Sequence, residues 1–176
     1  QASSQRVTSN QKKQQAASKG SAESFERHLA AMAGVRAALP LIDRIAHGIE
    51  STLRAGGKVL TCGNGGSAAE ALHFSEEMIG RFSKDRPPLA TVCLASDSTV
   101  MTCISNDFGF EQVFARQVVG LGRKGDALVA LTTSGKSKNV LLALQEAKTA
   151  GLMTIGLLGP PGSQAESLCD IAFTLS

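Results

Sequence analysis

The apolar positions of the chain are spaced in two ways, and the spacing changes near residue 58. Before it, large apolar side chains recur every three or four residues, as in an amphipathic helix. They fall in two sets, Phe25, Leu29, Met32 and Val35, and then Leu41, Ile42, Ile45, Ile49 and Leu53. Pro40 separates the two sets, and a pair of glycines at 56–57 supplies a common helix stop. This half of the pattern predicts a helical hairpin.

After residue 58 the apolar residues form short, nearly continuous runs, which are typical of strands buried on both faces. The runs are "KVLTCG", "LATVCLAS", "DALVALTTS", "MTIGLLG" and "DIAFTLS". Between them lie segments mostly with helical spacing, at 73–82, 100–104, 110–121 and 140–150. Strands that alternate with helices predict an α/β fold: a three-layer, doubly wound parallel sheet of about five strands, preceded by the hairpin.

The first 22 residues carry few large apolar side chains and are rich in Gln, Ser, Ala and Lys. Such a segment cannot bury enough apolar surface to offset the entropy lost on ordering. We therefore expect a flexible or helical basic tail at 1–22 and one folded domain at 23–176. With 176 residues, 43% of them hydrophobic, the chain has the length of a single α/β domain.

The net charge of +3 arises in this tail. Four of the 18 basic residues precede Glu23, the first acidic residue, which leaves 14 basic against 15 acidic residues in the remainder. Trp and Tyr are absent, so aromatic platforms for bases are scarce and nucleic-acid binding is not favoured. No run reaches the roughly 20 apolar residues of a membrane span, and the N-terminus does not resemble a secretory signal. We expect a cytoplasmic protein without a membrane partner.

The four cysteines, Cys62, Cys93, Cys103 and Cys169, include no CxxC pair. Their spacing suggests neither a disulfide framework nor a thiolate zinc site. We expect reduced and mostly buried thiols.

Polar residues gather where three of the predicted strands end, in "GNGGS", "SDST" and "TTSGKS". In an open parallel sheet, ligands bind beyond the carboxyl ends of the strands, so we expect these segments to meet at one cleft. Within the first, glycines permit positive φ, and Ser67 with Glu70 matches a capping box at the start of a helix. Backbone amides at that helix start suit an anion or sugar oxygens, although a simple tight turn would have the same sequence.

Two nucleotide-binding interpretations fit poorly. Gly63, Gly65 and Ala68 match a dinucleotide fingerprint, but the acid at the end of the next strand, Asp97, lies over 30 residues away instead of about 20. In "TTSGKS", a nucleotide P-loop would need glycine where Ala130 stands. What remains in this segment is four hydroxyls, Thr132, Thr133, Ser134 and Ser137. Hydroxyls and helix amides bind a phosphate monoester well, so we favour phosphate binding over a plain turn.

His73 and Glu77 are four residues apart in the helix predicted to follow the glycine loop. At about 100° per residue the two side chains lie on one helix face, where they can serve one ligand or one metal ion. A surface ion pair would have the same spacing. The nearby glycine loop favours a functional role.

Three segments together resemble the sugar isomerase (SIS) family, and within it the phosphoheptose isomerases. They are "CGNGGSAAEALHFSEEMIGRF", "RPPLATVCLASDSTVMTCISNDFGFEQVFARQV" and "LGRKGDALVALTTSGKSKNVLLALQEAKTAGL". The resemblance covers about 39–176 and implies a flavodoxin-like SIS fold. It also implies an aldose-ketose isomerase, an intramolecular oxidoreductase that converts sedoheptulose 7-phosphate to D-glycero-D-manno-heptose 7-phosphate through an enediol. That reaction is the first step toward the nucleotide-heptose precursors of lipopolysaccharide and other surface glycans.

The resemblance also implies roles for individual residues. It makes Glu77 the catalytic base and a metal ligand, and His73 a metal ligand or a group that polarises the carbonyl. The substrate-binding residues that it implies, besides Glu77, are Asn64, Gly65, Gly66, Ser67, Asn106, Asp107, Thr132, Thr133, Ser134 and Ser137. It further implies one zinc ion per subunit and a homotetramer with active sites between subunits.

In the family a helix after the fifth strand supplies a glutamine ligand and a histidine that is both ligand and general acid. The sequence ends at Ser176, and its other histidines, His28 and His47, precede the sheet. We therefore expect the chain to be a fragment that lacks this helix. Two non-catalytic alternatives belong to the same fold: a protein that binds the bacterial replication initiator, and a sugar-phosphate sensor. Glu77 and "NDFGFE" favour the enzyme over the first and hardly discriminate the second.

Overall fold

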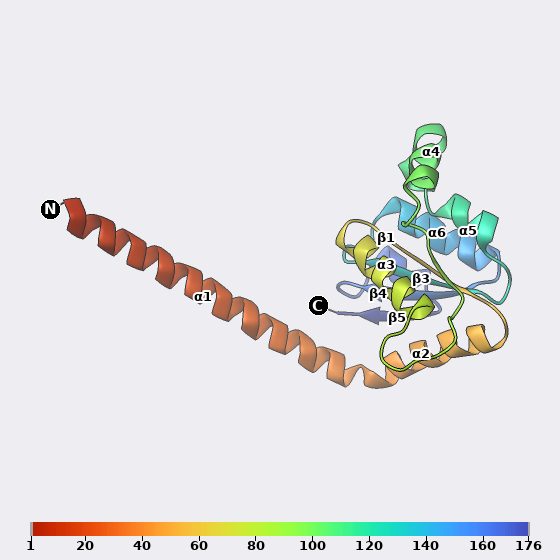
Figure 1. Ribbon diagram of the computed structural model, residues 1–176, viewed down its shortest axis with the longest axis horizontal. Coiled ribbons are helices and arrows are strands. Elements are labelled where there is room, and N and C mark those ends of the chain that lie inside the picture. The colour runs from red at the N-terminus through yellow and green to blue at the C-terminus, as the bar shows by residue number, and fades with distance from the viewer. Residues whose placement is uncertain (1, 176) are drawn as a thin grey trace. The chain divides into compact units, whose positions relative to one another are not determined.

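The computed structural model describes the backbone of residues 2–175 and the side chains of residues 20–175 (Figure 1). The chain divides into two compact units, Gln1–Leu39 and Pro40–Ser176. The first unit contains helix α1, Ala2–Ala37. The helix predicted from Phe25 is therefore present and extends further toward the N-terminus. Our boundary between residues 22 and 23 stays a prediction.

Helix α2, Leu39–Arg54, is the second predicted helix, and Pro40 lies in its first turn. Proline is tolerated there because the first amides of a helix have no partner within the helix. Its apolar stripe, Ile45, Ile49 and Leu53, packs against the sheet. The spacing read from the sequence thus places the correct face of α2 toward the core.

All five predicted strands form, in one parallel sheet with the order β2-β1-β3-β4-β5. Their bounds are Val59–Gly63 (β1), Thr91–Cys93 (β2), Ala127–Thr132 (β3), Met153–Leu158 (β4) and Ile171–Thr174 (β5). This order is that of flavodoxin-like folds, in which the chain reverses direction between β1 and β3. The inner strand β1 is buried throughout, whereas edge strand β5 is only half-buried. The prediction of a doubly wound sheet is confirmed.

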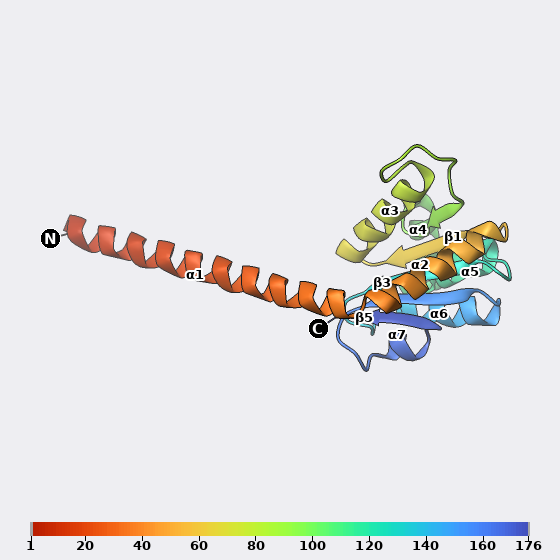
Figure 2. The same cartoon turned by 90° about the horizontal axis from the view of Figure 1, so that it is seen from below.

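Helices cover both faces of the sheet (Figures 1 and 2). The bounds of the remaining helices are Gly66–Ile79 (α3), Ser98–Phe108 (α4), Ala115–Leu121 (α5), Lys138–Thr149 (α6) and Gln164–Ser167 (α7), with a short 3₁₀ turn, Phe110–Gln112 (η1). One core cluster joins the sheet to α5 and α6 around Phe114 and Leu144. A second, smaller cluster lies under α2, where Ile45 meets Val129 and Ile155.

Helix α3 contains most of the segment whose helical spacing we noted at 73–82, and it starts at the glycine loop, as the expected cap at Ser67 implied. It begins seven residues earlier, at Gly66, and ends at Ile79 before Gly80. The early start makes the helix continuous with the glycine loop after β1, so every residue from that loop to Glu77 belongs to one rigid element.

No helix among the described residues is long and apolar enough to span a membrane.

Candidate active site

The glycine loop joins β1 to α3 by a tight turn. Gly65 has φ of +56° and is the N-cap of α3, as the predicted positive φ requires. The predicted capping box is wrong, because no side chain caps this helix and Ser67 lies inside its first turn. The backbone closes the turn instead: the Ser67 amide donates to the Asn64 carbonyl over 3.0 Å. Ser67 itself lines a cavity.

The hydroxyl-rich loop at 132–137 follows β3, the strand beside β1. Thr132 is buried, and its Oγ1 accepts a hydrogen bond from the Gly135 amide. Ser134 Oγ likewise accepts from the Lys136 amide, which shapes the turn. Ser137 is the N-cap of α6, yet its side chain makes no capping hydrogen bond. Its hydroxyl therefore remains available to a ligand at this helix start.

The two loops meet at one cavity of about 280 Å³, which is lined by Ser67, Thr132 and Thr133. A second cavity, of about 390 Å³, is lined by His73, Glu77, Glu70 and Arg86. Leu131 and Leu157 line both cavities and so form a shared apolar floor. The glycine loop and the hydroxyl loop therefore border one cavity, as we predicted for two of the three polar strand ends, and the His73–Glu77 face borders the neighbouring one. We call these two cavities and their shared floor the depression.

The third strand end, "SDST", takes no part in this depression. The Asp97 carboxylate caps α4 by accepting hydrogen bonds from the amides of Thr99 (2.9 Å) and Val100 (3.0 Å). Helix α4 begins beside edge strand β2, at the margin of the sheet. Our expectation that all three polar segments converge is therefore wrong for this one.

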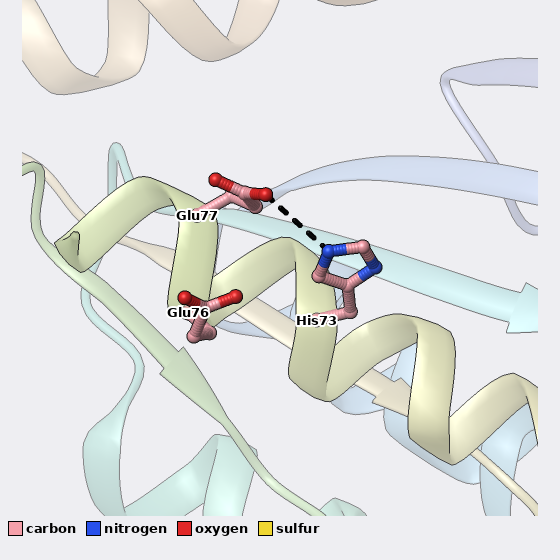
Figure 3. A group of neighbouring side chains, drawn as sticks. All are labelled: His73, Glu76 and Glu77. Atoms are coloured by element: carbon pink, nitrogen blue, oxygen red, sulfur yellow. Dashed lines mark ion pairs between the residues drawn. The ribbon is translucent and has the colours of Figure 1, made fainter. Parts of the chain in front are cut away.

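His73 and Glu77 lie side by side on α3, as their spacing predicted (Figure 3). His73 Nε2 is 3.3 Å from Glu77 Oε1, an ion pair when the imidazole is protonated. The side chain of His73 is 64% exposed and that of Glu77 is 29% exposed. The pair therefore remains open to a ligand from the solvent side.

Glu76 joins this pair, and our sequence reasoning missed it. One ligand atom each from His73, Glu76 and Glu77 can be chosen so that all lie within 4.8 Å of one another. Figure 3 shows the three side chains projecting from adjacent turns of α3. The spacing of three residues from His73 was a signal that could have identified it.

Asn106 and Asp107 lie on the exposed C-terminal turn of α4. Asn106 Nδ2 donates to Asp107 Oδ1 over 2.8 Å, and neither residue lines either of these two cavities. Within a single chain the structure does not bring them to the depression. Their contact with a substrate stays a prediction.

Two further polar residues hold the site in place, and our sequence reasoning did not identify them. The guanidinium of Arg86 donates to the carbonyls of Glu77 (2.7 Å) and Met78 (2.9 Å), at the C-terminal end of α3. A cation is favourable there, because the helix macrodipole places partial negative charge at that end. The second residue, Asn139, is buried and pairs with Asn64 of the glycine loop.

The cysteines depart in one place from our expectation of mostly buried thiols. Cys62 and Cys93 are buried, as expected, and burial raises the pKa of Cys62 to about 12. Burial also raises the pKa of the half-buried Cys169 to about 11, with Asp170 adding to the effect. Cys103 on α4, however, is exposed. No described cysteine forms a disulfide.

Comparison with known proteins gives a consistent picture. Residues 23–159 match the SIS domain family. The chain is similar to a phosphoheptose isomerase of Nitratiruptor, with 52% identity over 67% of this chain and 63% of that protein. It is also similar to a phosphoheptose isomerase of Burkholderia pseudomallei, with 44% identity over 83% of this chain and 74% of that protein. The chain thus spans between about three fifths and three quarters of these relatives.

Two solved structures resemble this fold closely. The phosphoheptose isomerase of Neisseria gonorrhoeae superposes with a TM-score of 0.81 at 36% identity, covering 87% of this chain and 82% of that one. The phosphoheptose isomerase of Francisella tularensis superposes with a TM-score of 0.83 at 37% identity, covering 86% and 82%. The similarity thus extends through the sheet and the helices that carry the depression.

Proposed function

This chain belongs to the phosphoheptose isomerases of the SIS domain family, and from that membership we propose that it isomerises sedoheptulose 7-phosphate to D-glycero-D-manno-heptose 7-phosphate. The observation that carries the proposal is the depression in which a hydroxyl-rich loop and a His–Glu pair border the same apolar floor. A phosphate-binding end and an acid-base end are the two parts that such an isomerase requires.

In the proposed complex the phosphate lies at the hydroxyl loop. Thr133, Ser134 and Ser137 offer hydroxyls to it, together with the amides at the start of α6, and buried Thr132 holds the turn. Hydroxyls and helix amides suit a phosphate monoester. The glycine loop, with Asn64, Gly65, Gly66 and Ser67, then faces the sugar hydroxyls. The carbonyl end of the open-chain sugar reaches His73 and Glu77 across Leu131 and Leu157.

Glu77 is the base in this proposal. Interconversion of ketose and aldose moves a proton from C1 to C2 through an enediol, and one carboxylate can remove it from one carbon and return it to the other. Glu77 suits this task because its side chain is partly buried and lines the cavity. His73, 3.3 Å from it, is placed to hold or polarise oxygen atoms of the substrate.

Zinc is a proposed cofactor, and the geometry of the described residues fits it. Two ligands about 2.0–2.1 Å from a tetrahedral zinc ion lie about 3.3 Å apart, which is the separation of His73 Nε2 and Glu77 Oε1. Glu76 is within reach as a further oxygen ligand. When bound, zinc would stabilise negative charge on the substrate oxygens during proton transfer.

Assembly and location belong to the same proposal. We infer a cytoplasmic homotetramer with sites between subunits. Sites between subunits would account for Asn106 and Asp107, which line neither cavity of their own chain. In that arrangement they would contact substrate held by another subunit. The product would serve the synthesis of nucleotide-heptose precursors of surface glycans.

The decisive experiment incubates the natural full-length protein with sedoheptulose 7-phosphate and traps the aldose with a coupled heptose kinase. Product formation that depends on the protein supports the isomerase. Substrate binding by calorimetry without any product would instead identify a sugar-phosphate sensor. A protein that neither binds nor converts the sugar would refute the substrate assignment.

A further inference from the structure

Asn64 and Asn139 form a closed pair of side-chain amides. Asn64 Nδ2 donates to Asn139 Oδ1 over 2.8 Å, and Asn139 Nδ2 donates to Asn64 Oδ1 over the same distance. Asn64 belongs to the glycine loop after β1, and Asn139 to the first turn of α6, directly after the hydroxyl loop. The pair therefore joins two loops that lie 75 residues apart in the sequence.

A third hydrogen bond fixes the orientation of both amides. The Val140 amide donates to Asn139 Oδ1 over 3.0 Å, so this oxygen must face the helix start. Asn139 Nδ2 then faces Asn64, and because this nitrogen is a donor, Asn64 must accept with its Oδ1. Asn139 is 3% exposed, and a buried amide is costly to leave without partners. The geometry of the pair is thus set from the α6 side.

The pairing leaves Asn64 partly free. A primary amide carries two donor hydrogens and two acceptor lone pairs. Asn139 uses one of each. One hydrogen and one lone pair of the half-buried Asn64 remain, and their directions are fixed by the pair. An amide held in this way can recognise a sugar hydroxyl at lower entropic cost than a free side chain.

We propose that Asn139 is a positioning residue that acts through Asn64, and that it holds the glycine loop and the hydroxyl loop at a fixed separation. This inference rests on the proposed function of the depression. A sugar phosphate that spans the two loops requires that separation, because a shift of about 1 Å at a reacting group can cost about a hundredfold in rate. Inorganic phosphate, which engages only the hydroxyl loop, does not require it.

A double-mutant cycle tests the inference in the natural full-length protein. We expect Asn139→Ala to lower kcat/KM for sedoheptulose 7-phosphate by about tenfold or more, as loss of a buried positioning contact does. In the Asn64→Ala background the same substitution should change kcat/KM by less than about twofold. The inhibition constant of inorganic phosphate should also change by less than about twofold. Independent, additive losses would overturn the inference, and so would an equal loss of phosphate binding.

Two further variants separate positioning from stability. Asn139→Asp keeps the acceptor for Val140 and Asn64 but loses the donor, so its kcat/KM should fall between those of the natural protein and Asn139→Ala. Thr154→Val is the matched control. Thr154 Oγ1 is buried and donates to the Leu168 carbonyl near the amino end of β4, far along the strand from both loops. It should lower the melting temperature and leave kcat/KM unchanged.

If the protein has no isomerase activity, the same cycle is measured on the Kd of sedoheptulose 7-phosphate by calorimetry. Coupling in Kd without turnover would support the role of Asn139 and refute the isomerase. Additive changes in Kd, or no binding of the sugar phosphate, would refute the role of Asn139.

Discussion

Thr61 of β1 and Ser75 of α3 share a buried hydrogen bond, with 2.9 Å between their hydroxyl oxygens. Thr61 Oγ1 also donates to the carbonyl of Ala71, one turn earlier in α3. Both contacts fix the rotation of the helix on the sheet. His73 and Glu77 lie two residues before and after Ser75, so each is turned about 200° from it. The anchored face of α3 thus directs these two side chains away from β1.

Removing the Thr61 hydroxyl should destabilise the protein more than removing the Ser75 hydroxyl. Thr61→Val keeps the shape but leaves the buried Ser75 hydroxyl without its partner, so we expect a loss of about 1–3 kcal/mol. Ser75→Ala retains the bond from Thr61 to Ala71 and should lose only about 0.5–1.5 kcal/mol. Urea unfolding of both variants measures the difference. The reverse order would show that the helix is not held through Thr61.

Glu77→Gln should abolish turnover while the Kd of sedoheptulose 7-phosphate stays near that of the natural protein. The amide has nearly the same shape as the carboxylate but cannot accept the proton from carbon. We expect kcat to fall at least about a thousandfold, within the usual contribution of a general base. Glu70→Gln, on the same helix and also lining the cavity, is the control and should retain most activity. Surviving turnover in Glu77→Gln would remove Glu77 as the base.

Zinc binding should depend more on His73 than on Glu76. His73→Ala removes a nitrogen ligand from the pair whose spacing matches a zinc site, so zinc affinity should fall about 10–100-fold or more. Glu76→Gln removes the exposed, outer carboxylate, and we expect a smaller loss. Competition with a chromogenic chelator measures both affinities independently of turnover. If neither substitution changed the zinc affinity, any metal would bind elsewhere. If metal-free protein had full activity, zinc would not be needed for the reaction.

Gly159→Ala should disturb the hydroxyl loop directly. A Cβ at Gly159 would collide with the Thr133 carbonyl oxygen, so the backbone must shift. We expect a loss of about 1–3 kcal/mol and a raised KM for the sugar phosphate. Gly120→Ala in α5 is the matched control, because nothing lies within 4 Å of a Cβ there. It should stabilise the protein by about 0.4–1 kcal/mol. An unchanged KM in Gly159→Ala would separate Thr133 from substrate binding.

Asp126, between α5 and β3, should make stability depend on acidity. Its burial alone would raise the pKa of this carboxyl, but hydrogen bonds from the Lys58 side chain and amide and from the Arg123 amide hold the pKa below 3.8. Because this pKa is lower in the folded state than in the unfolded state, the ionised carboxylate stabilises the fold above about pH 4. That stabilisation is lost as the pH falls through the pKa of the folded state. Asp126→Asn should therefore be less stable at pH 7, with a gap that narrows as the pH falls below about 4.

Chemical unfolding between pH 3 and pH 7 measures this gap. Glu50→Gln, which breaks the exposed pair between Glu50 and Arg54, serves as the control and should change stability by less than about 1 kcal/mol. A gap between natural protein and Asp126→Asn that stays constant with pH would contradict the prediction.

The sequence predicted the sheet well because each strand is a short apolar run that needs burial on both faces. It also predicted that His73 and Glu77 share a face, since helical periodicity depends on spacing alone. The bounds of α3 were less accurate. The expected cap at Ser67 placed the helix start two residues late, because the cap is Gly65, and the apolar spacing extended the helix past its end at Ile79.

Side-chain hydrogen bonds between residues that are far apart in the sequence could not be predicted from residue types and spacing. The pairing of Asn64 with Asn139 spans 75 residues, and neither residue type is unusual at its position. Likewise, "SDST" looked like the other polar strand ends, but Asp97 serves to cap α4. Whether a polar residue faces its own helix or a cavity depends on backbone conformation within a few residues, which residue types alone do not determine.

The shared floor of Leu131 and Leu157 bears on how the depression would tell one sugar from another. Apolar side chains offer no hydrogen bond to the hydroxyls of the middle carbons. The floor would therefore select substrates by the number of carbons between the phosphate and the carbonyl. It would not distinguish the configurations of those carbons. Stereochemical selection would then fall to the polar groups beside the floor, and above all to the fixed amide of Asn64.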